Sequence, residues 1–352
     1  MTNAKVFQIS RFLKTIEVEL VNIRESPAEI QNFFKKSDEK KRSRFLKKIL
    51  GDKNLGDIVF ERLTLLFAVL VFLLVLFMAW EMYSNSELSI NKFGWKFLIT
   101  TTWDPYAENF SALPMIFGTI VSSLLALIIA VPLGLSVAIF LAELAPAWLE
   151  KPLSFLTELL AAIPSVVYGL WGIFVLVPWL RDVVEPFLQN QFPNSPFFQG
   201  APYGYDMLAG GVILSIMVLP IISSISRDVL KSVPDPLREA AYGLGATKWE
   251  VTKTVFTNAR SGILGAIILG FGRAVGETMA VVMVIGSRPQ ITASILKPAS
   301  TIAGALANEF SEASSDLYLS ALIELALILF VITIIINIFA RLLVWGTERR
   351  WK

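Results

Sequence analysis

One polar loop of this chain reads Glu239-Ala240-Ala241-Tyr242-Gly243-Leu244-Gly245. A long apolar segment lies on each side of the loop, and each segment is long enough to cross a membrane as a helix. The loop itself predicts a short helix with an acidic residue near its start and a face of small side chains. A membrane protein that exposes such a helix in the cytoplasm offers another protein a docking surface.

The composition of the whole chain also indicates a membrane protein. The 352 residues are 55% hydrophobic and only 17% charged, and the mean hydropathy is +0.62. Soluble domains are less apolar and more charged. The chain contains neither Cys nor His, which removes thiol nucleophiles, disulfides and the imidazole base of most hydrolytic triads. We therefore expect no catalytic residues, no metal site, no cofactor and no nucleic-acid partner.

Six segments are long and apolar enough to span the hydrocarbon, which takes roughly 20 residues. They are about Leu63–Trp80, Leu113–Leu141, Leu153–Leu180, Met207–Ser226, Ser261–Gly286 and Tyr318–Trp345. Pro164 lies inside the third segment, and we expect it to bend that helix without ending it. The predicted fold class is an all-α polytopic membrane protein with six transmembrane helices.

The distribution of positive charge predicts the orientation of these helices. With the N-terminus in the cytoplasm, 25 of the 31 Lys and Arg residues fall in cytoplasmic segments. Five fall outside, and Arg273 lies within the fifth span. Cytoplasmic loops carry the excess of Lys and Arg in membrane proteins. We therefore place both the N-terminus and the C-terminus in the cytoplasm.

Residues 1–57 precede the first span and are predicted to form a basic, amphipathic cytoplasmic extension. Phe12 and Ile16 share one helical face with the apolar residues that follow, and Lys and Arg are frequent around Phe45. Such a segment is typical of a helix that lies on anionic lipid, although a regulatory contact is the alternative. Residues 58–346 are predicted to form the membrane domain, with the polar loop at 233–258, and residues 347–352 a cytoplasmic tail.

Local sequence explains why the polar loop should be helical. Pro234 and Pro236 end the preceding span, and Asp235 is expected to cap a helix that begins at Pro236. Glu239 would then lie in the first turn, where the helix dipole favours negative charge. An ordinary connecting helix would show the same features.

The remaining residues of the loop favour a contact surface. Ala240, Ala241 and Gly245 leave a smooth face for close packing. Trp249 supplies an aromatic anchor of the kind that dominates interface energetics. A Glu-Ala-Ala triplet alone would be weak evidence, because such triplets are common in helices.

The longer motif is more specific. It runs from Arg238-Glu239-Ala240-Ala241 to Leu244-Gly245-Ala246-Thr247-Lys248-Trp249-Glu250. This stretch resembles the EAA loop of the permeases of ABC importers, the coupling helix that docks into a cleft of an ATPase subunit. Such loops usually leave through an aliphatic residue followed by proline, where this chain has Thr257-Asn258. Asn258 is expected to cap the fifth span in place of that proline.

Three further stretches, Ala161–Gly172, Ile222–Asp228 and Leu269–Val281, resemble the PstC-type permeases of phosphate importers. The resemblance covers about residues 55–346 and implies the type I, MetI-like permease fold in a bacterial inner membrane. It also implies the partners: a second permease of PstA type, a dimer of ATP-binding subunits, an external phosphate-binding protein and phosphate itself. The sequence contains no G-x-x-x-x-G-K-[ST] motif, so ATP hydrolysis is expected on another chain.

Charged residues inside the predicted spans are the candidates for the substrate pathway. Arg273 and Glu277 stand four residues apart and would share a helical face, and Glu324 would lie at nearly the depth of Arg273 on the sixth span, as a candidate second partner for it. An arginine at the bilayer centre costs at least ~2.5–3.5 kcal/mol, and an i,i+4 pair returns only ~0.2–0.5 kcal/mol. Arg273 should therefore face the protein interior or a wet cavity. Either a structural ion pair or a cationic step for an anion would satisfy this requirement.

Other functions remain open at this point. An ion-coupled transporter or channel would explain the charges within the spans without an ATPase. A permease for another oxyanion, such as molybdate, tungstate or sulfate, is a third possibility. Only the resemblance to phosphate importers in the third and fifth spans argues against it. An intramembrane enzyme has the least support, because the chain contains no His and no Cys.

Overall fold

The computed structural model describes residues 55–349, so the predicted N-terminal extension falls almost entirely outside the described residues. Six helices of the described part are long and apolar enough to cross a membrane. The same part contains no strand apart from two isolated bridges. The predicted fold class is therefore confirmed. The chain divides into two compact units, Met1–Leu76 and Phe77–Lys352, each of which is described by itself.

In the first unit, the described residues form the first part of helix α3 (Leu55–Asn85). Beyond Gly56 this helix contains neither Gly nor Pro, and Leu, Val and Phe fill it on every side. The most apolar window of this span buries none of its residues within the protein. A helix that is apolar all round is typical of a segment that lies in an apolar environment such as a membrane.

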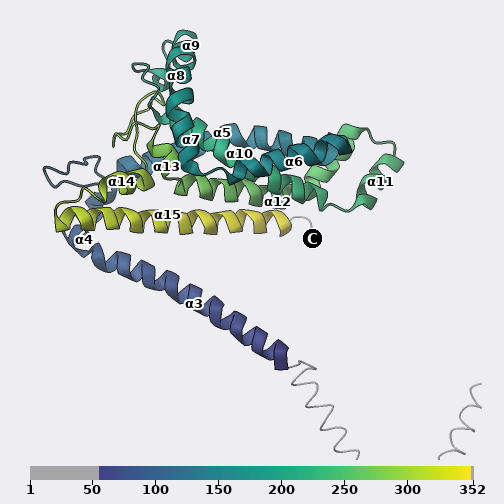
Figure 1. Ribbon diagram of the computed structural model, residues 1–352, viewed down its shortest axis with the longest axis horizontal. Helices are drawn as coiled ribbons and strands as arrows, with labels where there is room; N and C mark the ends of the chain where they lie inside the picture. Colours follow the sequence, from purple (N-terminus) through teal and green to yellow (C-terminus); the bar gives the residue numbers. More distant parts are fainter. Residues whose placement is uncertain (1–54, 350–352) are drawn as a thin grey trace, which may run out of the picture. The chain divides into compact units, whose positions relative to one another are not determined.

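Helices α5 (Leu113–Ile139) and α10 (Met207–Lys231) lie side by side in the core of the second unit (Figure 1). Small buried residues recur at every fourth position of α5 and therefore follow one i+4 ridge along the helix. They are Gly118, Ser122, Ala126, Ala130, Gly134 and Ala138. A Cβ added to Gly134 would lie 3.1 Å from the side chain of Ile222 on α10. Such small residues allow two helix backbones to approach closely.

Helix α12 (Lys248–Gly276) packs beside α10, and α15 (Asp316–Arg349) packs beside α12 (Figure 1). The shorter helices connect and flank these long ones. They are α4 (Glu87–Phe93), α6 (Ala147–Ala162), α7 (Ser165–Trp171), α8 (Val177–Trp179), α9 (Glu185–Gln191), α11 (Asp235–Gly243), α13 (Met279–Val282) and α14 (Ile302–Glu309).

An aromatic cluster fixes the start of α15. The ring of Tyr318 stacks on Phe110 with the centroids 5.0 Å apart. The Tyr318 hydroxyl donates to Oε2 of Glu309 at 2.5 Å, and Nε1 of Trp103 donates to the same oxygen at 2.7 Å. Both polar tips therefore find a partner while the rings stay packed.

The third span differs from the predicted Leu153–Leu180, and the cause is Pro164. Helix α6 ends at Ala162, Ile163 and Pro164 are extended, and α7 begins at Ser165. A proline disfavours the helical conformation of the residue before it, so Pro164 ends one helix where we expected it to bend one. The candidate span is the stretch Ser165–Gln191 that follows, and α6 packs against α10.

The fifth span also differs, because α12 begins at Lys248 and the prediction began at Ser261. Thr247 and Glu250 form a capping box: Thr247 N–H donates to Oε2 of Glu250 at 2.8 Å, and Glu250 N–H donates to Oγ1 of Thr247 at 3.4 Å. This reciprocal pair satisfies two backbone donors at the helix start. The helix ends at Gly276, ten residues before the predicted end at Gly286.

Candidate functional site

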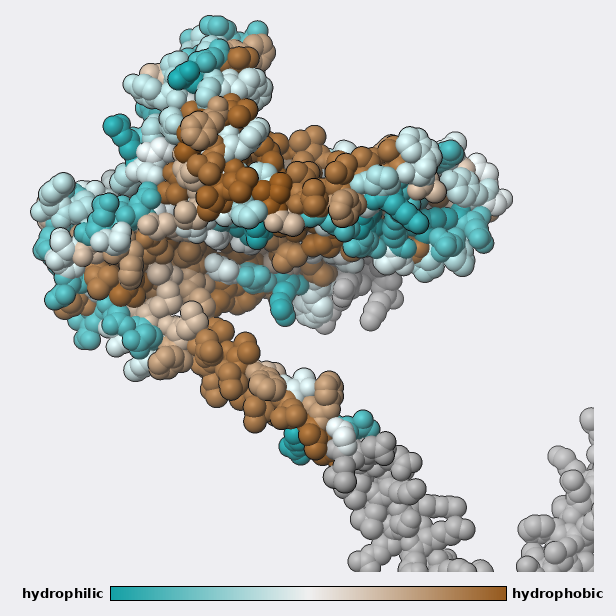
Figure 2. All heavy atoms as spheres, in the orientation of Figure 1, coloured by the Kyte–Doolittle hydropathy of each residue, from teal (hydrophilic) through white to brown (hydrophobic). Residues whose placement is uncertain are grey.

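Helix α11 joins α10 to α12 at one end of the second unit (Figure 1). Figure 2 shows hydrophilic residues around this end and hydrophobic residues over the middle of the bundle. The start of α11 corrects two predictions. The helix begins at Asp235 itself, and the Asp235 carboxylate does not cap it but accepts a hydrogen bond from Nη1 of Arg238 at 3.1 Å. Glu239 consequently lies in the second turn and not in the first.

Most of the predicted contact residues are accessible. The exposed residues of the loop include Glu239, Ala240, Tyr242, Leu244, Gly245 and Trp249. Leu244 is 90% exposed and Trp249 is 72% exposed, and large apolar side chains exposed together in a polar loop fit a surface that another protein covers. Ala241 differs from this group, because it is half-buried and packs against the core cluster around Leu230 and Val255.

Gly245 shapes the turn that follows α11. Its φ is +83°, and a Cβ added there would meet nothing within 4 Å. Ala246 N–H donates to the Ala241 carbonyl at 3.1 Å, and Gly245 N–H donates to the Tyr242 carbonyl at 2.9 Å. These two bonds form a Schellman motif, which requires a left-handed residue at this position. Gly245 therefore supplies a backbone conformation in addition to the small surface that we predicted.

The predicted capping role of Asn258 is wrong. Asn258 lies within α12, and its side-chain amide donates to the Thr254 carbonyl one turn earlier at 2.8 Å. The capping box at Thr247 starts the helix instead, so the missing proline does not interrupt the passage from the loop into the fifth span.

Arg273 and Glu277 do not form the predicted helical pair. Helix α12 ends at Gly276, and Glu277 has an extended backbone with φ −72° and ψ 133°. The ion pairs of residues 55–349 include neither side chain. Arg273 is exposed on the surface of this chain, whereas Glu277 is half-buried at the helix end. The break removes the common face on which the pairing was predicted.

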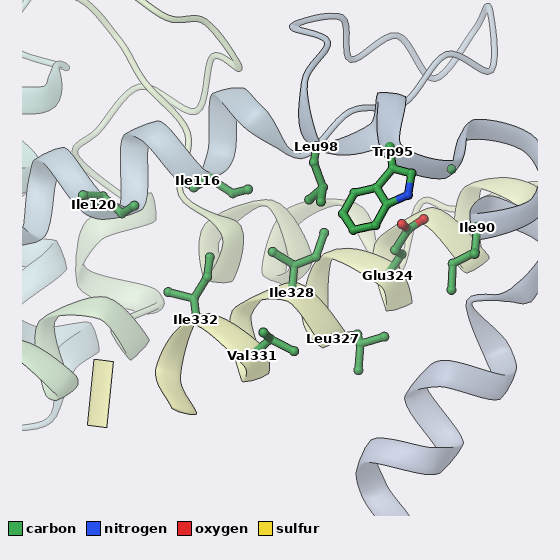
Figure 3. Close-up of a pocket in the computed structure, with 11 residues that line it drawn as sticks. Ile90, Trp95, Leu98, Ile116, Ile120, Glu324, Leu327, Ile328, Val331 and Ile332 are labelled. Atoms are coloured by element: carbon green, nitrogen blue, oxygen red, sulfur yellow. The ribbon is translucent and has the colours of Figure 1, made fainter. Parts of the chain in front are cut away.

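Glu324 lies in a different environment. It is 7% exposed on α15, in a groove of about 620 Å³ between α15, α5 and the segment after α4. Figure 3 shows its carboxylate beside the indole of Trp95, with Ile90, Leu327 and Ile328 around it. Its Oε2 has no hydrogen-bond partner among the described residues. The structure therefore surrounds Glu324 with apolar side chains and does not pair it with Arg273.

Two buried carboxylates were not among the predicted site residues. Asp206 is 1% exposed and caps α10, because its Oδ1 accepts from Ala209 N–H at 2.7 Å. Burial is the main cause that raises the pKa of Asp206 to about 7, and the nearby carboxyl of Glu185 adds to this effect. Aspartate directly before an apolar helix is a visible capping signal. Its burial beside Glu185 depends on the fold.

Comparison with known proteins identifies relatives over most of the chain. Residues 130–349 match the family described as "Binding-protein-dependent transport system inner membrane component". The "Phosphate transport system permease protein PstC" of Mesorhizobium japonicum is 46% identical over 301 residues, which cover 84% of this chain and 92% of the relative. The protein of the same name from Haemophilus influenzae is 46% identical over 291 residues, covering 81% and 92%.

A solved structure has the same fold. The inward-facing MetNI methionine ABC transporter superposes with a TM-score of 0.52 at 15% sequence identity, covering 70% of this chain and 99% of that chain. At this level of identity the likeness extends to the fold alone, and it agrees with the predicted MetI-like arrangement.

Proposed function

Because this chain belongs to the binding-protein-dependent transport system inner membrane components, and within them to the PstC-type permeases, we propose that it forms one half of the membrane pathway of an ATP-driven inorganic phosphate importer. The chain is a multi-pass inner-membrane protein and a transport subunit. The observation that carries the proposal is the identity of 46% over 84% of the chain with a phosphate permease. The names of the relatives favour phosphate over molybdate or sulfate.

The exposed surfaces fit a protein that works in an assembly. The span of α3, with Leu, Val and Phe on every side, suits contact with lipid or with a second permease of PstA type. The sequence contains no phosphate-binding G-x-x-x-x-G-K-[ST] motif. We therefore assign ATP hydrolysis to a dimer of partner subunits and delivery of phosphate to an external binding protein.

Helix α11 is the proposed contact with the ATP-binding subunit. Glu239, Ala240 and Tyr242 are exposed on it, and Leu244 and Trp249 follow as exposed apolar side chains. ATP binding would draw the two permeases' loops together and rock the spans around the substrate pathway. This assignment places the α11 end in the cytoplasm, in agreement with the charge distribution that puts both termini there.

Arg273 is the proposed phosphate-contacting residue. It is exposed on the membrane helix α12 and has no ion-pair partner among residues 55–349. An unpaired arginine facing lipid costs at least ~2.5–3.5 kcal/mol, so a polar environment between the two permeases suits it better. Glu277, near the end of the same helix, would keep the attraction for phosphate weak enough for release. Glu324 lies in an apolar groove, which gives no support to the predicted direct contact with Arg273.

Reconstituted transport tests this function. The complete assembly, with both permeases, the ATP-binding subunits and the binding protein, is placed in liposomes with labelled phosphate. We expect uptake that requires ATP and that unlabelled phosphate suppresses, whereas molybdate and sulfate in equal excess do not. Uptake without ATP would favour the ion-coupled transporter, and suppression by molybdate or sulfate would favour another oxyanion.

A further inference from the structure

The guanidinium of Arg238, on α11, uses every N–H that it has. Nε donates to Oε2 of Glu143 at 3.4 Å, and Nη2 donates to Oε1 of the same carboxylate at 2.8 Å. Nη2 also donates to the Leu230 carbonyl at 2.9 Å. Nη1 donates to the Val233 carbonyl at 2.5 Å and to Oδ1 of Asp235 at 3.1 Å. An arginine has five N–H donors, so none is left for solvent or for another protein.

These partners come from three separate parts of the fold. Glu143 lies in the helical turn Phe140–Leu144 that continues α5. The Leu230 carbonyl belongs to the last turn of α10, where the helix dipole favours positive charge, and the Val233 carbonyl lies in the turn between α10 and α11. Arg238 therefore ties α11 to the ends of both core helices.

The ion pair is shielded from water. The Arg238 and Glu143 side chains are 16% and 8% exposed, whereas the Asp235 side chain is 85% exposed. The hydrogen bonds that Arg238 donates to Glu143 raise the pKa of the Arg238 guanidinium. Leu237 and Ala241 of α11 pack on the apolar cluster that contains Leu230 and Val233. The ion pair between Arg238 and Glu143 is thus the main polar contact of α11 with the helix bundle. The apolar contacts of Leu237 and Ala241 support it from the same helix.

We propose that Arg238 is the positioning residue through which displacement of α11 is transmitted to α5 and α10. This inference rests on the proposed function, since α11 must be moved by a partner. The exposed residues of α11 would receive the force, and Arg238, on the buried side, would pass it to the helices. Because α5 and α10 pack closely at Gly134, where an added Cβ would lie 3.1 Å from the Ile222 side chain, the pair would move as one body.

Two conservative variants test the transmission. Arg238→Lys keeps the charge but has no planar fork for bidentate binding of a carboxylate, and Glu143→Gln keeps the shape but removes the charge. The matched control is Lys231→Gln, which breaks an ion pair with Glu150 at the same end of the bundle. That pair joins α10 to α6 and does not involve α11.

The readout is the number of phosphate ions moved per ATP hydrolysed in liposomes that contain the whole assembly. We expect Arg238→Lys and Glu143→Gln to co-purify with the ATP-binding subunits and to retain ATP hydrolysis, while phosphate moved per ATP falls about tenfold, within the range measured for coupling networks. The double variant should lose no more than either single variant, since both remove the same contact. Lys231→Gln should leave the ratio unchanged.

A spectroscopic measurement separates loss of transmission from simple misfolding. The chain contains no cysteine, so spin labels can be attached at Pro236→Cys on α11 and Leu144→Cys beside Glu143, both of which are exposed. We expect one narrow distance distribution with and without ATP, and a broader one when Arg238→Lys is added. An unchanged distribution together with an unchanged phosphate-to-ATP ratio in the variant would overturn the proposal. Failure of the unmodified assembly to transport phosphate would instead overturn the proposed function.

Discussion

Replacing Gly245 by alanine tests whether this glycine is needed for the backbone turn after α11. Gly245 has φ +83°, and an added Cβ would meet nothing within 4 Å. The cost of Gly245→Ala is therefore conformational, about 1–2 kcal/mol for an L residue in the left-handed region. Gly243 is the matched control, because it ends α11 with equally open space around its Cβ. Gly243→Ala should stabilise the helix by up to about 0.5–1 kcal/mol, since alanine loses less entropy than glycine.

Amide hydrogen exchange measures both effects at the same place. The amides of residues 245 and 246 donate to the Tyr242 and Ala241 carbonyls, so they are protected only while the turn is closed. A change of 1–2 kcal/mol is a factor of about 5–30, and Gly245→Ala should speed exchange at both amides by this factor. Gly243→Ala should slow it by up to about fivefold. Gly245→Asn should fall near the unmodified protein, because asparagine tolerates the left-handed region.

The two alanine variants must differ in sign for the reasoning to hold. Equal exchange rates in Gly243→Ala and Gly245→Ala, or faster exchange in the Gly243 variant, would mean that the left-handed turn does not control the local stability. The contact surface around Glu239 would then be the remaining reason for a glycine at position 245.

Arg273→Gln should lower phosphate uptake by about tenfold or more, because a charge-assisted contact contributes about 1.5–3 kcal/mol; co-purification of the subunits should be unchanged, and normal uptake would reduce Arg273 to a packing residue. Gly118→Ala should destabilise the protein by about 1–3 kcal/mol, since the new Cβ would overlap the Ser300 carbonyl oxygen. Its control is Gly272→Ala, whose Cβ would meet nothing within 4 Å, and thermal unfolding in detergent compares the two. Asp206 has a pKa raised from 3.8 to about 7, so the neutral form is favoured by folding and its stabilising contribution is lost as the pH rises through 7. The unfolding temperature should therefore fall between pH 5 and pH 8, and Asp206→Asn, which keeps a side-chain oxygen to cap α10, should make this fall smaller.

The long apolar segments were predictable from sequence because hydropathy over about 20 residues is a strong signal. The ends of the helices were less predictable from sequence. A signal for the start of α12 was present, since Thr247 and Glu250 have the spacing of a capping box, yet the apolar run that defines the span begins only near Ser261. The helix thus continues from the membrane into the polar loop, where hydropathy does not report it.

The side-chain environments of the candidate site depended on the fold. Sequence spacing put Arg273 and Glu277 on one face, but that rule holds only within one continuous helix, and α12 ends between them at Gly276. Likewise, the polar character of Glu324 did not indicate that Trp95 and apolar side chains surround it. Glu239 and Trp249 are exposed, as the prediction of a contact surface requires, because exposure in a polar loop depends mainly on local sequence. The contact of Arg238 with Glu143, 95 positions away, could not be read from local sequence.

The small residues of α5 also limit where a route for an ion can open. At Gly118 an added methyl group has no room beside the Ser300 carbonyl, and at Gly134 it would press on the Ile222 side chain of α10. Hydrated phosphate is far larger than a methyl group, and such a seam has few rotamers with which to rearrange. The close packing of α5 on α10 at Gly134 therefore leaves no room for hydrated phosphate between these two helices in this structure.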